Sequence, residues 1–314
     1  MDQLTEHIDA TAPDYDVDPG RPYKRKSWEK VDPIGSLPFL CVHAGALLVF
    51  LAGFNWVAAL TCLATFGMRM FGITGGYHRY FSHRTYKTSR AFQFVMAWLG
   101  ASSAQLGPLW WAAHHRHHHR HSDTEDDVHS PIVRTFFWSH VGWIMCRKNE
   151  ATNLSKIRDF AKFPELRFLN KYHVIPPLVL VLVLTIYGII LQTVFPGLGV
   201  TAFQIIVWGF FVSTVALYHC TFSINSLAHV IGTRRFDTED HSKNNFLLAI
   251  ATMGEGWHNN HHRYPSSERQ GYYWWEIDIT HYILRILSWF RLVWDIKTPP
   301  KEIYVEAKQK KRKT

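Results

Sequence analysis

The chain has 314 residues, of which 47% are apolar and 19% charged, and its formal net charge at pH 7 is +9. No known nucleic-acid-binding module accompanies the basic balance, so nucleic acid is not an expected partner. The cysteines show neither CxxC pairing nor the spacing of a secreted disulfide framework, so we expect small buried thiols at Cys41, Cys62, Cys146 and Cys220.

Two long stretches contain no Asp, Glu, Lys or Arg: one lies between Asp32 and Arg69, the other between Lys171 and Arg234. A hydrocarbon core about 30 Å thick requires such charge-free segments. A short turn interrupts each stretch, at residues 53–56 and 196–199, where glycine and proline end helices. The sequence therefore predicts an all-α membrane protein with four transmembrane helices in two hairpins, at about residues 36–52, 57–73, 174–195 and 201–223.

Lysine and arginine are absent from the two turns and concentrate between Arg79 and Lys171, and again from Arg234 onward. By the positive-inside rule, we expect both termini and the central segment to be cytoplasmic. We expect a polar, loosely ordered segment at residues 1–32, one membrane domain at 33–298 and a basic tail at 299–314. Such a multi-pass protein belongs in a bacterial cell membrane or in the endoplasmic reticulum, depending on the organism.

Twelve of the 20 histidines gather in four clusters that carry the expected chemistry. His78 and His83 follow the second predicted span as H-x4-H, His229 follows the fourth, and segments 114–121 and 258–262 each contain H-x2-H-H. Residues i, i+3 and i+4 share one face of a helix. Neutral imidazole binds Fe, Cu, Ni and Zn, and nine rings are too many for one ion. Since all four clusters fall on the cytoplasmic side, we expect one site for two metal ions.

Two points stay open from spacing alone. The run 114–121 contains two overlapping registers, His114/His117/His118 and His115/His118/His119. By itself, such a run is also typical of an adventitious metal-binding tract. Histidines outside the clusters are interpreted as structural or as partners of the ligands: His43, His129, His140, His173, His219, His241 and His281.

The three histidine boxes and the strings around them resemble the membrane fatty-acid desaturases, in particular the stearoyl-CoA-type, Δ9 branch. The boxes are His78-x4-His83, His115-x2-His118-His119 and His258-x2-His261-His262, and the supporting strings occupy residues 139–143, 225–229 and 254–262. The resemblance covers about residues 35–295. It implies a four-span fold with a cytosolic cap that carries a histidine-ligated di-iron site. It also implies an O2-dependent reaction that places a cis double bond, at Δ9, in a long-chain acyl-CoA or acyl lipid.

The same resemblance implies the residues of the site. Its register selects His115 over His114, because Gln105 and Trp111 then fall where the family lines a bent acyl tunnel, and Thr221 matches the third residue at that bend. One departure concerns the acyl carrier: animal enzymes have an Arg and an Asp that contact CoA just before the second box, where this chain has Ala113 and His114. The implied metal ligands are His78, His83, His115, His118, His119, His229, His258, His261, His262 and, through a water, Asn225.

Side chains cannot remove hydrogen from an unactivated methylene, so a cofactor must supply the oxidant. We expect the two Fe ions that the resemblance implies, with O2 as co-substrate. Hydrogen bonds from outside the ligand shell should fix the tautomer of each ring. The chain has no haem or flavin fingerprint, which predicts a separate electron donor such as ferredoxin or cytochrome b5. A hydroxylase or ketolase on the same scaffold is the nearest alternative. A membrane metal transporter or store is a remote one, because its ligands would follow a path through the spans.

Overall fold

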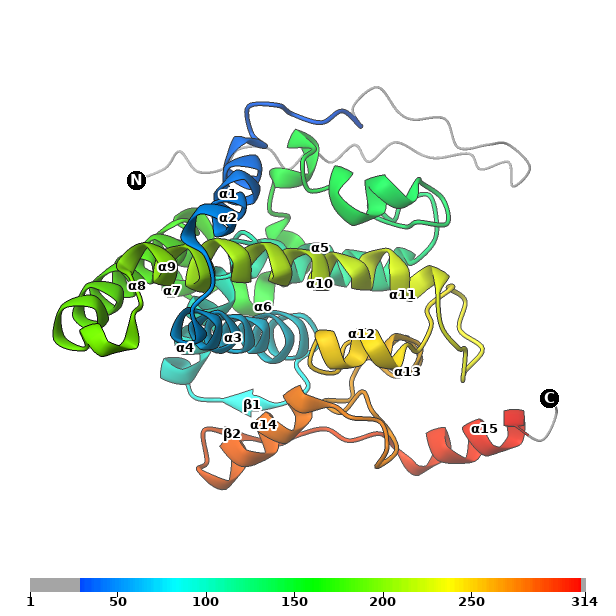
Figure 1. Cartoon of the computed structure of the whole chain (residues 1–314). Coiled ribbons are helices and arrows are strands. Elements are labelled where there is room, and N and C mark those ends of the chain that lie inside the picture. Colours follow the sequence, from blue (N-terminus) through cyan, green and yellow to red (C-terminus); the bar gives the residue numbers. More distant parts are fainter. Residues whose placement is uncertain (1–28, 312–314) are drawn as a thin grey trace.

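The computed structural model describes residues 29–311, so the loose order expected for residues 1–32 falls almost entirely outside the described residues. The described chain is helical except for one antiparallel pair of two-residue strands, β1 and β2 (Figure 1). The elements are α1 Leu37–Leu47, α2 Val49–Ala52, α3 Trp56–Phe71, η1 Gly72–Ser82, β1 Lys87–Thr88, α4 Arg90–Ala101, α5 Pro108–His121, η2 Trp138–Gly142, η3 Arg147–Glu150, η4 Leu154–Ile157, α6 Arg158–Ala161, α7 Pro164–Lys171, α8 Ile175–Val194, η5 Pro196–Leu198, α9 Ala202–Ile206, η6 Val207–Val212, α10 Ser213–Asn225, α11 Leu227–Val230, α12 Phe246–Ala251, α13 His258–Arg263, α14 Ile279–Trp289, β2 Val293–Trp294 and α15 Lys301–Lys311.

Within residues 29–311, three continuous helical segments are long and apolar enough to cross a membrane: Trp56–Ser82, Ile175–Val194 and Ala202–Val230. They include the second, third and fourth predicted spans. The first predicted span is also an apolar helix, Leu37–Ala52, but it is shorter than the others. The prediction of apolar helices long enough to cross a membrane is therefore confirmed for three segments, and the crossings themselves and their number remain a proposal.

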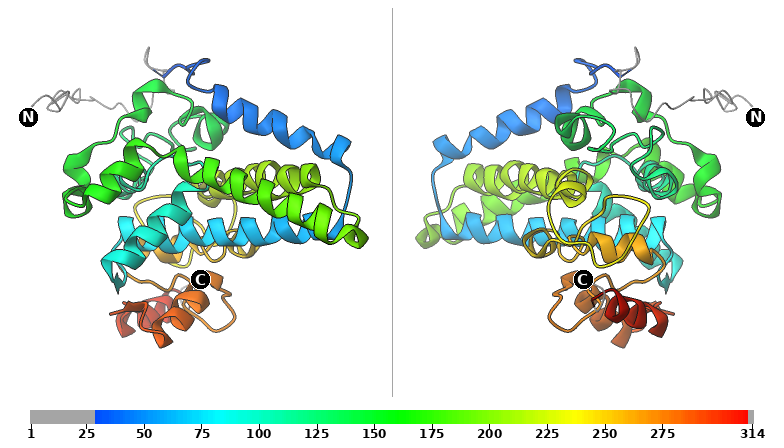
Figure 2. Two further views of the ribbon diagram at one scale, coloured as in Figure 1. Left: turned by 90° about the vertical axis from the view of Figure 1, so that its left-hand side faces the viewer. Right: turned by 90° about the vertical axis from the view of Figure 1, so that its right-hand side faces the viewer.

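The two predicted turns lie beside each other at one end of the molecule. Asn55 caps α3 by accepting a hydrogen bond from the Val57 N–H, and its Nδ2 donates to the carbonyl oxygen of Leu198 in the other turn, 3.1 Å away. Trp208 Nε1 donates to the carbonyl oxygen of Gly53, again joining the two hairpins. Figure 2 shows these helices running together toward the end opposite the remaining chain. These contacts join the two hairpins at their turns, and the first apolar helix packs mainly against η6 and α10 of the other hairpin rather than against α3.

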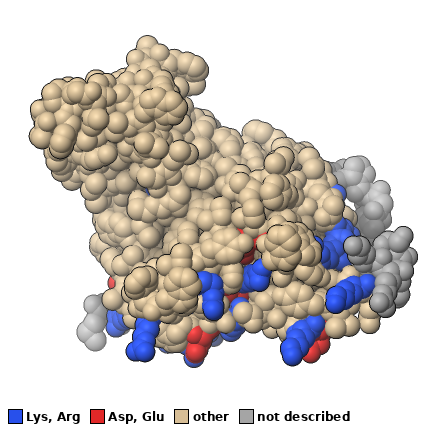
Figure 3. All heavy atoms as spheres, turned by 60° about the horizontal axis from the view of Figure 1, so that its bottom comes forward, with Lys and Arg blue, Asp and Glu red and all other residues tan. Residues whose placement is uncertain are grey.

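Charged side chains are segregated in space as they are in sequence. Figure 3 shows Lys, Arg, Asp and Glu at the lower part of the molecule, whereas the large lobe at the upper left shows none on this face. We call the part outside the apolar helices, residues 83–174 and 231–311, the cap. The largest buried apolar cluster joins the cap to η1, because Tyr77 and Phe81 pack with Leu109, Leu166 and residues of α14. This shared core holds the inner ends of the apolar helices against the cap.

The expected basic tail contains a helix that packs on the cap. In α15, Ile303 is buried against Phe236 and Tyr272, and Glu306 forms an ion pair with Arg263 at 2.7 Å. Sequence charge alone suggested a solvated segment, because the lysines follow one another closely. The apolar side chain of Ile303 makes this contact, which the charge pattern alone does not predict.

Candidate metal centre

The H-x4-H pair is brought onto one side of its helix by a change in helix type. In a regular α-helix, residues five apart lie about 140° apart around the axis. Here α3 continues into the π-helical segment η1, in which the His83 N–H donates to the carbonyl oxygen of His78, five residues earlier. The two imidazole centroids consequently lie only 4.8 Å apart. The wider turn makes this spacing suitable for binding one ion.

Gly72 permits the close approach of this segment to α4. A Cβ atom at Gly72 would lie 2.5 Å from the backbone carbon of Leu99 and 2.6 Å from the backbone nitrogen of Gly100. Both contacts are with backbone, which cannot move aside as a flexible side chain can. Packing of α4 against η1 therefore depends on the missing side chain, and this packing holds His78 and His83 in place.

Two further helices carry the H-x2-H-H boxes. Helix α5 begins at Pro108, a favourable first helical residue, and its box begins about two turns later, at His115. The short helix α13 begins at His258 itself, so its box occupies nearly the whole helix. In both, the i, i+3 and i+4 positions share one face. His229 comes from α11, where the helix restarts after a break at Ser226.

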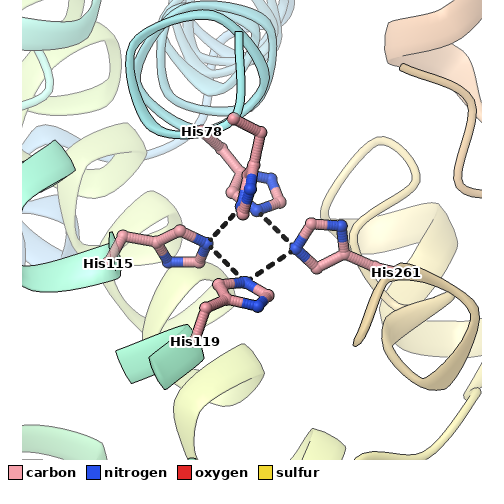
Figure 4. Close-up of side chains that lie close together, drawn as sticks. His78, His115, His119 and His261 are labelled. Carbon is pink, nitrogen blue, oxygen red and sulfur yellow. Dashed lines mark hydrogen bonds between the residues drawn. The ribbon is translucent and has the colours of Figure 1, made fainter. Parts of the chain in front are cut away.

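The nine predicted histidines converge as two groups, within each of which the candidate ligand atoms lie no more than 4.8 Å apart. Figure 4 shows the rings of His78, His115, His119 and His261 turned toward a common centre from η1, α5 and α13. In the first group, Nε2 of His261 is 3.0 Å from Nε2 of His78 and 2.9 Å from Nε2 of His119. The first group is His78, His83, His115, His119 and His261; the second is His118, His229, His258 and His262.

The structure also distinguishes the two registers of the second box. His115 joins the first group, with its Nε2 2.8 Å from Nε2 of His83. His114 turns away, its Nδ1 donating to the carbonyl oxygen of Trp110 at 3.0 Å, and His117 contacts the carbonyl oxygen of Asp126. Neither belongs to a group of candidate ligands. The geometry thus favours His115/His118/His119.

In four of the nine rings a carboxylate contacts Nδ1, the ring nitrogen that points away from the other histidines of the group. A carboxylate oxygen lies 2.5 Å from Nδ1 of His78, 2.9 Å from that of His118, 2.8 Å from that of His229 and 2.5 Å from that of His262. An ionised carboxylate only accepts, so each Nδ1 carries the proton and each Nε2 presents a lone pair. The partners, in the same order, are Glu255, Asp127, Asp123 and Asp240.

Protonation favours the same arrangement. Burial, followed by neighbouring imidazoles, lowers the pKa of five rings well below the usual value, which keeps them neutral: His83, His115, His119, His258 and His261. Burial opposes ionisation of Asp123, but its hydrogen bonds with His229, Ser130 and the His241 N–H together outweigh this and lower its pKa to about 2. Asp240 behaves likewise, its pKa lowered by His262 against the effect of burial. These five rings are therefore neutral ligands beside ionised carboxylates, whereas Asp127 raises the pKa of His118 in spite of its burial.

These residues fit a pair of cations. Nε2 of His262 is buried and has no hydrogen-bond partner among the described residues, although it faces the second group. A buried nitrogen lone pair without a partner is costly, and a bound metal would satisfy it. The carboxylates around the rings would balance positive charge that a purely imidazole shell leaves uncompensated. The site therefore has the donors, protonation and charge of a two-ion, all-imidazole metal centre.

A long apolar cavity of about 880 Å³ reaches this centre. His115 and Asn225 line it at the metal end, and Phe39, Val42 and Phe210 line it between the apolar helices. The three predicted tunnel residues all lie on its wall: Gln105 Nε2 donates to Thr221 Oγ1 at 3.1 Å, and Trp111 stacks on His115 with centroids 5.0 Å apart. An extended apolar ligand in this cavity would lie beside the metal ligands.

From the sequence we expected hydrogen-bond partners for the ligand rings, but we did not identify the four carboxylates that fill this role. A signal existed in the sequence, because Asp123, Asp127 and Glu255 each lie within nine residues of a histidine box. Arg79 was also missed. It is buried beside His78 and pairs with Glu255, Glu268 and Asp278. This ionic cluster fixes Glu255, and through it the orientation of His78.

Comparison with known proteins identifies the family. The family model described as fatty acid desaturase matches residues 54–290. This chain belongs to the fatty acid desaturase family. It is 34% identical over 276 residues to the sn-1 stearoyl-lipid 9-desaturase of Anabaena variabilis, covering 87% of this chain and 96% of that one. The acyl-CoA C20 Delta5-desaturase of Anemone leveillei is 33% identical, covering 87% and 84%, and Delta-9 acyl-lipid desaturase 1 of Arabidopsis thaliana is 34% identical, covering 87% and 86%.

Membership of the desaturase family confirms the prediction of an oxidoreductase that acts on paired donors with O2. It also confirms the family expected from the histidine boxes. The desaturases similar to this chain differ in the position at which they act, since their names include Delta5 as well as Delta-9. Position and carrier therefore have to be argued from this chain's own residues.

Proposed function

We propose that this desaturase introduces a cis double bond at Δ9 of a long-chain saturated acyl group, in unsaturated fatty acid biosynthesis. The observation that carries the proposal is that an apolar cavity ends at His115, a member of the first of the two histidine groups. The names of two relatives from different organisms, the stearoyl-lipid 9-desaturase and the Delta-9 acyl-lipid desaturase, support Δ9. Both cover most of this chain at about a third identity.

The nine grouped histidines would hold two Fe ions, one ion in each group, and Asn225 would hold a water near them. When bound, the iron pair would supply the oxidising power for removing hydrogen from an unactivated methylene, with O2 as co-substrate. The carboxylates act on the rings rather than on the substrate. By holding Nδ1–H, Asp123, Asp127, Asp240 and Glu255 keep each Nε2 lone pair aimed at the ion.

The cavity would bind and orient the acyl chain. Its apolar wall excludes water from the methylenes beside the metal end, and Trp111, which stacks on the ligand His115, places the chain at a fixed distance from it. The Gln105–Thr221 hydrogen bond joins the segment after α4 to α10 and would fix the shape of the bend. Because the position of the double bond depends on orientation, these three residues would determine which carbons react.

The remaining parts of the proposal concern the membrane and the electron donor. Leu37–Ala52 would complete four spans, with both termini and the cap in the cytoplasm, in a bacterial cell membrane or the endoplasmic reticulum. Three apolar helices and the clustering of Lys and Arg in the cap support this topology. A ferredoxin or a cytochrome b5 would deliver electrons to the cap, because the sequence carries no fingerprint for a redox cofactor beyond the histidines.

Expression in a host that lacks a desaturase tests the function. Cells are fed a saturated fatty acid, and lipid extracts are analysed by mass spectrometry after derivatisation that locates double bonds. We expect a new cis double bond at carbon 9. A hydroxylated or keto chain would instead establish the alternative, a hydroxylase or ketolase on the same scaffold.

A further inference from the structure

The loop that carries Gln105 to the wall of the cavity has a strained backbone. We call residues 102–107, between α4 and α5, the bend loop. Ala104 and Leu106, on either side of Gln105, have φ values of 56° and 62°, in the left-handed region that residues other than glycine rarely adopt. Such conformations persist only where the surrounding structure holds them, and they concentrate at functional sites. The contacts that hold these two residues therefore determine how Gln105 reaches Thr221.

Two buried tyrosines bond directly to the strained residues. The Tyr77 hydroxyl donates to the carbonyl oxygen of Leu106 at 3.0 Å, and the Tyr218 hydroxyl donates to that of Ala104 at 2.8 Å. Tyr77 is fully buried and Tyr218 is 4% exposed, so each hydroxyl depends on this partner. The carbonyl groups on either side of Gln105 are thus tied to two different helices, η1 and α10.

Tyr77 also links the bend loop to the metal centre. It directly precedes His78, whose ring faces the first histidine group (Figure 4). Its own ring centroid lies 6.0 Å from that of Trp111, which stacks on His115. The ring has no room to move toward α4, because a Cβ atom at Gly100 would lie 2.2 Å from Cε1 of Tyr77. Tyr77 is therefore a tightly packed spacer between the histidines and the bend loop.

Tyr218 makes the corresponding link on α10. Thr221 and Asn225 follow it by three and seven residues, so the three side chains share one face of the helix. All three residues line the cavity. Because Thr221 Oγ1 accepts the hydrogen bond from Gln105, α10 meets the bend loop at two points, one on the loop backbone and one on a side chain. These two contacts fix the position of the bend loop along α10.

Resting on the proposed desaturase function, we propose that Tyr77 and Tyr218 are specificity-determining positioning residues, whose hydroxyl groups fix the distance between the bend and the metal centre. They act through the bend loop and not on the reacting carbons. Without one hydroxyl, the strained residue that it holds relaxes toward a common backbone conformation, and Gln105 moves with it. A displacement of about 1 Å already changes which atoms are aligned for reaction. The acyl chain then reacts at neighbouring carbons as well as at the usual pair.

Tyr77→Phe and Tyr218→Phe test the proposal, because each removes one hydroxyl and keeps the ring. The full-length variants and the wild type are expressed in a host without a desaturase that is fed stearate, and double bonds are located by mass spectrometry after derivatisation. We expect the fraction of double bonds away from the wild-type position to rise about three- to tenfold in each variant, as loss of one buried hydrogen bond allows. The double variant should show a larger fraction than either. Iron per chain should equal that of the wild type, since no proposed ligand is altered.

Tyr86→Phe is the matched control. The Tyr86 hydroxyl donates to the carbonyl oxygen of Gly75 in η1 at 2.8 Å, and the residue is 2% exposed, so this variant also loses a buried bond from tyrosine to the backbone. Tyr86 does not line the cavity. We expect its product positions to equal those of the wild type, because the distribution of positions does not depend on how much enzyme is folded.

A wild-type distribution in Tyr77→Phe, Tyr218→Phe and the double variant would overturn the inference. Equal broadening in Tyr86→Phe would also overturn it, since any loosening of the fold would then have the same effect. If Tyr77→Phe does not fold, Tyr218→Phe decides the outcome from the other helix. Failure of the proposed function gives a different result, in which the iron-loaded wild type itself forms no double bond. Each variant is compared with the wild type's own position, so the test holds whether or not that position is Δ9.

Discussion

Nδ1 of His262 lies 2.5 Å from a carboxylate oxygen of Asp240, while Nε2 of the same ring has no hydrogen-bond partner within the described chain. The first contact fixes the proton on Nδ1, and the second leaves a buried lone pair directed at the other rings of its group. Burial keeps this imidazole neutral, lowering its pKa to about 4 even though the bond to Asp240 acts in the opposite direction. His262 thus shows the arrangement found around the centre, in which a carboxylate holds the outer nitrogen of a ring and the inner nitrogen keeps a free lone pair.

The first prediction follows from that pair. Asp240→Asn removes the charge and the obligatory acceptor, so the His262 ring loses its fixed tautomer. We expect a 10- to 100-fold loss in iron affinity or activity, the usual effect of removing a partner of a ligating histidine. Iron per chain is measured with activity on purified protein. Asp295→Asn, at an exposed carboxylate paired with Lys87, is the control. Equal iron in both variants would show that Asp240 does not support a ligand.

The second prediction concerns the register in α5. His115→Ala should remove a ligand that lies 2.8 Å from His83, with loss of most bound iron and nearly all activity. His114→Ala should retain iron, because that ring bonds to the backbone at Trp110 instead. The two variants serve as each other's control, since they differ by one position in the same helix. A comparable loss of iron in both would contradict the assigned register.

Much of this arrangement could be predicted from the sequence, since charge-free stretches located the apolar helices and the histidine boxes located the centre. Other parts depend on contacts that no local pattern encodes. The π-helical segment that brings His78 close to His83 packs on α4, and spacing alone reveals neither the helix type nor this contact. Asp240 is 22 residues before His262 and reaches it only through the folding of the intervening loop. The choice of His115 over His114 needed the resemblance, because spacing left it open.

The third prediction tests the number of crossings. Leu37–Ala52 is the shortest apolar helix, yet the turn that follows it is tied to the other hairpin by the hydrogen bond from Asn55 to Leu198. Reporter tags inserted at Asn55 and at Gly199 should therefore both be accessible from the side opposite the cytoplasm, and tags at either terminus from the cytoplasm. A tag at Asn55 that is accessible only from the cytoplasm would exclude the four-span arrangement.

The fourth prediction concerns the position of the double bond. Trp111→Ala enlarges the cavity beside His115, so the acyl chain should be held less precisely and double bonds should appear at positions other than carbon 9. Product positions are compared with those of Trp98→Ala, a partly buried tryptophan that does not line the cavity. Iron content is measured as well, because Trp111 stacks on a proposed ligand. An unchanged distribution of positions in iron-loaded Trp111→Ala would remove Trp111 from the tunnel.

The most direct test of the account is to follow hydrogen and oxygen together in one product. Cells that express the enzyme are given perdeuterated stearate under 18O2, and the recovered acyl chains are analysed by mass spectrometry. The account predicts chains that have lost two deuterium atoms at carbons 9 and 10 and contain no 18O, because the oxygen leaves as water. Recovery of 18O within the acyl chain, or of chains with the double bond mainly at Δ12 or ω3, would contradict it.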